Sequence, residues 1–387
     1  MDIKILAVDD ELDMEELIKQ KFRKKIRNGE YNFVFAYNGV DALTKFVEYP
    51  EISLILSDIN MPEMDGLTLL TKVKELKNPS LKTIIVSAYG DMENIRTAMN
   101  RGAFDFVTKP INFDDLEVTI EKTLDEIKIY RKSMKEHDQL VAIQQDLSVA
   151  REIQQSILPK EFPAFPQRKD FDIFASMDAA KSVGGDFYDF FMIDDNKLGF
   201  VIADVSGKGV PAAIFMAVSR TLIRSTALKG IPPEDCMQYS NELLAKESVN
   251  SMFVTVFYGI LNLKTGELQY SNAGHNPPYI LQKDGSVKTV EGTGDIVLGV
   301  MENMDYHSKS VKLNPGDTIF TFTDGITEAM DVDFNEYTDE KLIQLLKTQS
   351  GNSPKEMINN VVEDVKIFTK GAEQSDDITT LALKFLG

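Results

Sequence analysis

The chain has 387 residues, 43% of them hydrophobic and 27% charged, which is enough sequence for two domains that each bury a core. Its 61 Asp and Glu outnumber its 42 Lys and Arg, and the formal net charge of −19 predicts a surface that repels nucleic-acid phosphates. No apolar run approaches the ~20 residues of a membrane span, and the acidic residues 1–10 are unlike a signal peptide. The single Cys236 can form no internal disulfide. We therefore expect a cytoplasmic protein that binds neither nucleic acid nor membrane.

Strand-like apolar runs alternate with amphipathic helical stretches over the first 125 residues. This alternation predicts a parallel sheet that is covered by helices on both faces. In such sheets the functional residues lie at the carboxyl ends of the strands. The five runs that we expect to form strands are residues 3–8, 32–36, 54–57, 83–87 and 106–108.

Polar residues follow four of these five predicted strands. They are Asp9 and Asp10 after the first strand, Asp58 after the third, Ser87 at the end of the fourth and Lys109 after the fifth. Any one of these aspartates alone would be read as a helix cap or a turn residue. Three converging carboxylates would repel one another, so their pattern predicts a divalent cation at this edge of the sheet. With a hydroxyl and a lysine beside them, the site suits transfer of a phosphoryl group to an aspartate.

These residues carry a family resemblance. The motifs VDDE, LSDINMPEMDG, VSA and FVTKP resemble those of the receiver domain of two-component signalling. The resemblance implies that a sensor histidine kinase supplies the phosphoryl group and that Asp58 accepts it. It also implies that Asp9, Asp10, Asp58 and the backbone carbonyl of Asn60 serve Mg²⁺, and that Ser87 and Lys109 contact the phosphoryl group. Phe106 matches the switch aromatic residue of the family.

Residues 111–158 contain neither Gly nor Pro and predict a long helix. Asn112 can cap its start, and a continuous helix of this length would extend about 70 Å. The alternative is two helices with a break near residues 137–138. Because such a helix cannot bury its apolar stripe alone, we expect it to pair with another chain or with a neighbouring domain, and we favour a homodimer. The apolar positions expected to pair are Ile120, Ile127 and Met134, followed by Leu140, Leu147 and Ile157.

The remaining sequence, from about residue 161, predicts runs of strands separated by pairs of helices. This order is typical of antiparallel sheets with helices packed on their outer faces. The expected helices are residues 211–228, 232–248, 339–348 and 354–368. The expected strands are residues 171–177, 187–193, 197–204, 253–262, 267–272, 278–281, 318–323 and 379–385.

Four acidic positions stand at the ends of these predicted strands, three of them beside glycines. They are Asp186 in GGDFYD, Asp204 in ADVSGKG, Asp324 in TDGITEA, and the pair Asp376 and Asp377 in SDDIT. Such carboxylates beside flexible backbone are typical of hard-cation sites such as those for Mg²⁺ or Mn²⁺. The sequence contains only three His, with no zinc spacing and no Ser-His-Asp arrangement, and Cys236 fits a helix core better than a nucleophile.

The motifs SVGGDFYDFF, IADVSGKGVPAAI, SNAGHNPPYI, FTDGITEA and SDDIT, in this order, resemble the SpoIIE/RsbU-type branch of the PP2C-like (PPM) serine/threonine phosphatases. The resemblance implies two Mn²⁺ or Mg²⁺ ions that activate a water for in-line attack on a phosphate ester. It assigns the metals to Asp186, Asp204, Asp324 and Asp376, with Asp377 as a supporting partner and a carbonyl ligand from Val205. Val205 stands where the family's general pattern has glycine.

Two further residues have open roles. Lys181 either binds phosphate, as an arginine does in some relatives, or is a solvated surface lysine. His275 in AGHNP either donates a proton to the leaving group or is a structural hydrogen-bonding histidine.

We therefore expect a receiver domain of (βα)5, flavodoxin-like fold at residues 1–125 and a helical linker at 126–160. A PP2C-like phosphatase domain, an α/β sandwich of two antiparallel sheets flanked by helices, should follow at 161–387. The resemblance implies a response regulator in which Asp58 controls dephosphorylation of a STAS-domain anti-sigma-factor antagonist. One alternative is a catalytically weak scaffold that binds a phosphoprotein. Another is a phosphatase that acts on a small molecule or on an aspartyl phosphate.

Overall fold

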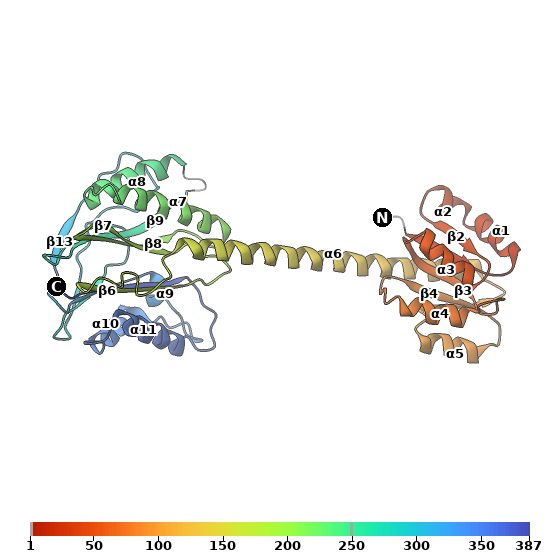
Figure 1. Ribbon diagram of the computed structural model, residues 1–387. Coiled ribbons are helices and arrows are strands. Elements are labelled where there is room, and N and C mark those ends of the chain that lie inside the picture. Colours follow the sequence, from red (N-terminus) through yellow and green to blue (C-terminus); the bar gives the residue numbers. More distant parts are fainter. Residues whose placement is uncertain (1–2, 248–250) are drawn as a thin grey trace. The chain divides into compact units, whose positions relative to one another are not determined.

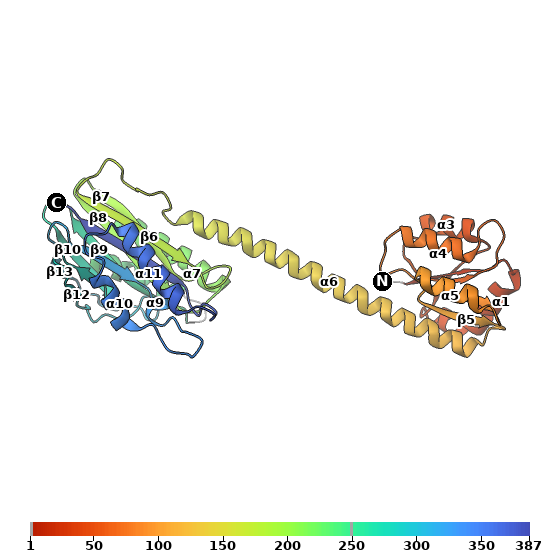
Figure 2. The ribbon, with the colours of Figure 1, turned by 90° about the horizontal axis from the view of Figure 1, so that it is seen from below.

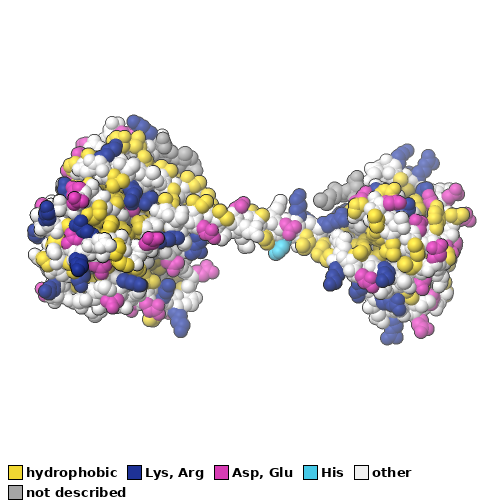
Figure 3. All heavy atoms as spheres, viewed as in Figure 1, with side chains coloured by type: hydrophobic (Ala, Val, Ile, Leu, Met, Phe, Trp, Pro, Cys, Tyr) yellow, Lys and Arg dark blue, Asp and Glu magenta, His cyan; other side chains and the backbone are white. Residues whose placement is uncertain are grey.

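The computed structural model describes residues 3–247 and 251–387 and divides into two compact units, 1–143 and 144–387 (Figure 1). Each unit has its own sheets and its own hydrophobic core. On the face shown in Figure 3, charged side chains of both signs are interspersed with hydrophobic ones on each unit. Within the described ranges, no helix combines the length and the apolar character that spanning a bilayer requires.

The first unit contains a five-stranded parallel sheet in the order β2-β1-β3-β4-β5. Its central strands are buried because helices cover both faces, which is why their residues form nearly continuous apolar runs. The strands are β1 (Lys4–Val8), β2 (Asn32–Ala36), β3 (Ile52–Asp58), β4 (Lys82–Ala88) and β5 (Asp105–Lys109). The helices between them are α1 (Leu12–Lys21), α2 (Arg23–Arg27), α3 (Gly39–Glu48), α4 (Gly66–Glu75) and α5 (Met92–Arg101).

One helix, α6 (Phe113–Ile157), begins in the first unit and ends in the second (Figures 1 and 2). It is continuous, so the alternative of a break near residues 137–138 is not what the structure shows. Asn112 accepts hydrogen bonds from the backbone N–H groups of Asp114 and Asp115, as expected of a cap.

Only part of the pairing surface predicted on α6 is free to pair. Ile120 and Ile127 are fully buried in the core of the first unit, so these two positions are wrong, whereas Met134 and Leu140 are exposed and stay a prediction. In the second unit, Leu147 is half-buried, whereas Val149 and Ile153 are exposed. A helical repeat of apolar residues looks the same whether it faces its own domain or another chain.

The second unit is a sandwich of two five-stranded antiparallel sheets, in the orders β13-β10-β9-β8-β7 and β12-β11-β14-β15-β6. Their strands are β6 (Phe171–Asp178), β7 (Phe187–Asp194), β8 (Lys197–Val205), β9 (Val254–Asn262), β10 (Glu267–Ala273), β11 (Tyr279–Leu281), β12 (Val287–Thr289), β13 (Lys309–Lys312), β14 (Thr318–Phe322) and β15 (Ile378–Phe385). Two of the four edge strands, β12 and β13, are short, largely exposed and were not predicted.

Helices cover the outer face of each sheet (Figures 1 and 2). The first sheet carries α7 (Val210–Ala227) and α8 (Pro233–Glu247), and the second carries α10 (Thr338–Lys347) and α11 (Pro354–Phe368), with the short α9 (Asp324–Thr327) after β14. The predicted end of α8 at Ser248 lies outside the described residues. The main core fills the space between the two sheets, where aromatic residues such as Phe200 and Phe257 are fully buried.

A buried ion pair fixes α7 to the first sheet. The carboxylate of Asp189 on β7 is 1% exposed and lies 2.9 Å from Arg220 and 2.6 Å from Arg224, both on α7. A buried carboxylate is stable only when it is paired in this way. The contact sets the position of α7, whose first turn follows directly on the loop that bears Asp204.

Candidate active sites

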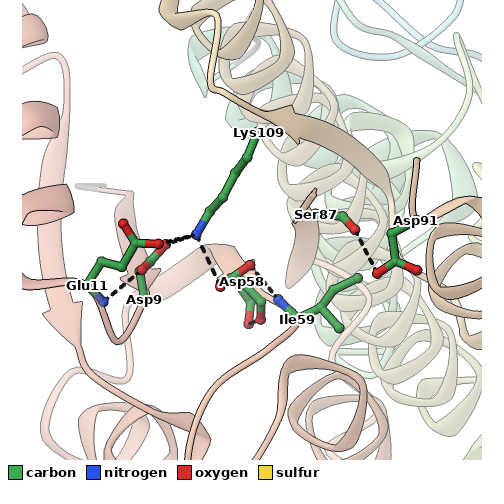
Figure 4. A network of polar contacts seen from close by, with 8 residues as sticks. Asp9, Glu11, Asp58, Ile59, Ser87, Asp91 and Lys109 are labelled. Carbon is green, nitrogen blue, oxygen red and sulfur yellow. Dashed lines mark hydrogen bonds and ion pairs between the residues drawn. The ribbon is translucent and has the colours of Figure 1, made fainter. Parts of the chain in front are cut away.

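The first candidate site lies at the carboxyl ends of β1, β3 and β5. Oxygen atoms of Asp9, Asp10 and Asp58 lie within 4.8 Å of one another. Lys109 donates from its ammonium group to Asp9 at 3.1 Å and to Asp58 at 3.2 Å (Figure 4). The parallel strand order places these ends side by side, because β1 and β3 are neighbours and β5 follows β4.

The electrostatics of this site suit a divalent cation. Burial raises the pKa of Asp58, and the repulsion of Asp9 adds to this, while Lys109 opposes it. Burial alone would lower the pKa of Lys109, but the opposite charges of Asp9 and Asp58 outweigh this and raise the pKa above its usual value, so the lysine stays cationic. One lysine cannot neutralise three carboxylates, and oxygen ligands this close together fit Mg²⁺.

The roles proposed for Ser87, contact with the phosphoryl group, and for the Asn60 carbonyl, binding of Mg²⁺, stay predictions. The buried hydroxyl of Ser87 lies 3.4 Å from Asp91 (Figure 4). Asn60 is exposed, two residues after Asp58.

Glu11, which sequence reasoning missed, lies 3.3 Å from Lys109; its only signal was its place as the last residue of VDDE. The Lys109–Pro110 peptide bond is cis.

The second candidate site lies at one end of the sandwich, where β7 and β15 begin and where β8 and β14 end. Strands β7 and β8 are antiparallel with Phe187 opposite Ala203, so Asp186 and Asp204 lie across from each other. Strands β14 and β15 pair in the same way, with Phe322 opposite Thr380, so Asp324 lies near the residues that precede β15.

A buried threonine connects the two halves of this site. The hydroxyl of Thr323 donates to Asp186 at 2.7 Å, and its oxygen accepts from the backbone N–H of Thr379 at 3.0 Å. The contact joins loops of opposite sheets and fixes the orientation of the Asp186 carboxylate. Thr323 was missed because its partner lies far away in the sequence; its only signal was its place directly before Asp324.

The carboxylates of this site carry more negative charge than the protein around them compensates. Burial strongly raises the pKa of Asp186, with further repulsion from Asp204 and Asp377. Burial also raises the pKa of Asp204 to about 7, with a contribution from Asp324, and the pKa of Asp324 is raised by burial and by Asp376. Such an arrangement is stable with the carboxylates ionised only if cations bind among them.

These carboxylates are spread more widely than those of the first site. Among the described residues, only Asp9, Asp10 and Asp58 bring three ligand atoms within 4.8 Å of one another. Carboxylate oxygens of this kind are the ligands that hard cations such as Mg²⁺ and Mn²⁺ prefer.

Glycines allow the loops of this site to approach one another. A Cβ atom on Gly184 would lie 2.3 Å from the carboxylate of Asp377, and one on Gly185 would lie 2.9 Å from the carbonyl oxygen of Val205. The Val205 carbonyl is therefore close to the backbone that bears Asp186. A side chain at either glycine would push the loops apart.

Asp376 and Asp377 lie in different environments. The buried Asp377 carboxylate accepts hydrogen bonds from the backbone N–H groups of Ala180 at 2.8 Å and Gly185 at 2.7 Å. Asp376 is half-buried, and its Oδ2 lies 2.8 Å from the ammonium group of Lys208. Asp377 thus holds the loop before Asp186. Asp376 instead forms an ion pair with Lys208, and its carboxylate can leave this pair to bind a metal ion.

We therefore expect different defects from Asp376→Asn and Asp377→Asn. The first should lower the rate of metal-dependent phosphate-ester hydrolysis more strongly and raise the metal concentration needed for half-maximal activity. The second keeps an oxygen that can accept from one backbone N–H, so it should reduce thermal stability with a smaller loss of metal affinity. Metal titrations of hydrolysis, together with melting curves, test this. If Asp377→Asn has the larger effect on metal dependence, the ligand role belongs to Asp377.

The structure also bears on the two residues whose roles the sequence left open, Lys181 and His275. Lys181 is exposed, and in the described part of the chain no contact joins it to the carboxylates; Lys208, which the sequence reading passed over, is the cation beside them. His275 is buried, with Nδ1 2.8 Å from the Thr255 hydroxyl and Nε2 3.1 Å from the Phe322 carbonyl oxygen. Burial lowers its pKa to about 4. Both ring nitrogens are occupied, which favours the structural role.

Helix α6 contacts the loop of this site through a buried glutamine. The side-chain amide of Gln154 donates to the carbonyl of Gly184 at 2.6 Å and accepts from the N–H of Gly184 at 3.1 Å. The residue is 6% exposed. The last turns of α6 therefore hold the backbone two residues before Asp186.

Residues 5–121 match the family described as response regulator receiver domain, and residues 194–386 match the family described as Stage II sporulation protein E (SpoIIE). The phosphoserine phosphatase RsbU of Bacillus subtilis is 32% identical over 261 residues, which cover 66% of this chain and 76% of RsbU. This chain belongs to the SpoIIE/RsbU phosphatase family and carries an N-terminal receiver domain.

Two other proteins are similar to parts of this chain. The protein IcfG of Synechocystis is 31% identical over 265 residues, which cover 62% of this chain but only 41% of IcfG. The structure of the SiaA PP2C domain of Pseudomonas aeruginosa aligns with a TM-score of 0.56 at 20% identity, over 64% of this chain and 98% of that one. The second unit therefore has the PP2C fold, as predicted.

Proposed function

We propose that this chain is a response regulator in which phosphorylation of Asp58 controls a metal-dependent protein serine/threonine phosphatase. The observation that carries the proposal is the cluster of the buried Asp186 with the half-buried Asp204 and Asp324, whose pKa values are all raised by burial and mutual repulsion. Such a cluster costs stability unless it binds cations, and cations among carboxylates are the usual means of hydrolysing phosphate esters.

In the phosphatase unit, two Mn²⁺ or Mg²⁺ ions would activate a water for attack on phosphorus. The residues that would hold them are Asp186, Asp204, Asp324, Asp376 and the carbonyl of Val205. The other side chains of the site keep these ligands in place. Thr323 orients the Asp186 carboxylate, and Asp377 and Gln154 fix the backbone that precedes it.

In the receiver unit, Asp58 is the proposed phosphoacceptor, and Asp9, Asp10, Asp58 and the Asn60 carbonyl are the proposed Mg²⁺ ligands. A carboxylate oxygen of Asp58 forms the new bond to phosphorus, while the bond between phosphorus and the donor breaks. Lys109, 3.2 Å from Asp58, would neutralise charge on the incoming phosphoryl group. A sensor histidine kinase is the proposed donor.

The proposed substrate is a phosphoserine or phosphothreonine on a STAS-domain anti-sigma-factor antagonist. The support is similarity alone, because RsbU is named a phosphoserine phosphatase. We also propose that the protein acts in the cytoplasm as a homodimer. The exposed Val149 and Ile153 on α6, with the exposed Met134 and Leu140, offer apolar surface for a second copy.

The test is hydrolysis of p-nitrophenyl phosphate by the full-length chain. We expect turnover that requires Mn²⁺ or Mg²⁺, stops with EDTA and returns when the metal is restored. Binding of a phosphorylated STAS protein without any turnover would instead favour a scaffold. Turnover that survives complete metal removal would contradict the proposed site.

A further inference from the structure

A groove of about 630 Å³ adjoins the carboxylate site of the phosphatase unit. One wall is the end of α6, with Leu147 and Arg151, and the floor is the loop 179–183. The opposite wall is the start of α7, with Gly209 and Val210.

The backbone segments that line the groove also contact the carboxylate site. The N–H of Ala180 in the floor donates to Asp377, and Gly209 in the wall follows directly on Lys208, which pairs with Asp376. A protein segment that lies in the groove would therefore end beside the metal-binding carboxylates.

The side chains that line this groove carry positive charge, although the chain as a whole is acidic. The lining contains two cations, Arg151 and Lys181, and no carboxylate, although the whole chain has a formal charge of −19. Both cations are exposed, and in ranges 3–247 and 251–387 neither forms an ion pair or side-chain hydrogen bond with the protein. Unpaired cations beside a cluster of carboxylates are available for an anionic partner.

Apolar surface extends the groove along α7. Val210, Ile214 and Val218 follow one another at four-residue steps on one helix face and are 44%, 62% and 38% exposed. Val210 also lines the groove, as does the half-buried Leu147, so this apolar strip meets the groove that holds Arg151 and Lys181. A surface of this kind, with an apolar centre and a charged rim, is typical of a protein-binding site.

We propose that this groove docks the phosphoprotein substrate through a segment that carries acidic and apolar side chains next to its phosphoserine. The proposal rests on the proposed function, since it concerns the substrate of that same site. The carboxylates repel any phosphoprotein before metal binds, and Arg151 and Lys181 offset this repulsion where the flanking residues of the substrate lie. The apolar strip receives the hydrophobic side chains of the same segment.

The test compares two synthetic phosphoserine peptides that share an apolar sequence and differ only in flanking residues, Glu in one and Lys in the other. With Mn²⁺ and full-length protein, the Glu peptide should have a KM at least about fivefold lower. In the double variant Arg151→Glu, Lys181→Glu this preference should be lost or reversed, with kcat little changed. A matched control, Lys288→Glu with Lys347→Glu, changes two exposed lysines outside the groove and should keep the preference.

Hydrolysis of p-nitrophenyl phosphate, which is too small to reach the groove, separates this proposal from the proposed function. It should stay within about twofold in both double variants. No hydrolysis of any substrate by the unaltered chain would overturn the phosphatase itself. Normal hydrolysis without peptide preference, or equal effects of the two double variants, would overturn only the groove. A change in oligomeric state of the groove variant with an unchanged preference would assign this surface to a second copy and contradict the proposal.

Discussion

Asp204→Asn and Asp324→Asn should each lower kcat for p-nitrophenyl phosphate by about 100-fold or more, because each removes a charged oxygen from the group that binds metal and stabilises the transition state. Asn has nearly the same volume, so the fold should persist. The metal-free variants should even melt at the same or a higher temperature, since each loses one of several mutually repelling buried charges.

Melting curves distinguish a loss of metal binding from a loss of folding. Asp195→Asn, which changes an exposed carboxylate on the turn after β7, serves as the control and should alter neither property. If the Asp204 and Asp324 variants hydrolyse at the unaltered rate, these residues bind no catalytic metal. A lost activity that accompanies a lower melting temperature without metal would show that the carboxylates support the fold instead.

Asp58→Asn should abolish labelling of the chain by a small phosphodonor. With Mg²⁺ and acetyl phosphate, we expect the unaltered chain to gain one acid-stable, base-labile phosphoryl group. The Asn side chain cannot form the acyl phosphate, so intact-mass measurement should show no increase. Asp125→Asn changes an exposed carboxylate on α6 that pairs with Lys128, and this variant should label normally. Labelling of Asp58→Asn to the normal extent would assign the acceptor to another residue.

Much of the fold could be predicted because its signals are local. Apolar runs followed by Asp9, Asp58 and Lys109 mark parallel strands and their functional ends, and the parallel sheet brings these ends together. In the second unit, glycine beside carboxylate predicted strand ends at Asp186 and Asp204, and the antiparallel pairing of β7 with β8 places them opposite each other.

The parts that could not be predicted depend on contacts between distant segments. Thr323 and Gln154 act through hydrogen bonds to Asp186 and Gly184 in other loops, and no local pattern marks either residue. The apolar repeat of α6 was assigned to pairing with another chain, but Ile120 and Ile127 fill the core of their own unit. Periodicity shows that a helix has an apolar face without showing what covers it.

The central claim is that the state of Asp58 controls the phosphatase unit. The most direct measurement is phosphate release from a phosphorylated STAS-domain protein by the full-length chain, with saturating Mn²⁺ and Mg²⁺, before and after treatment with acetyl phosphate. The account predicts that treatment changes the rate at least about fivefold in the unaltered chain, as expected of allosteric coupling, and leaves the rate of Asp58→Asn unchanged. An unchanged rate in the phosphorylated chain, or the same change in Asp58→Asn, would contradict it.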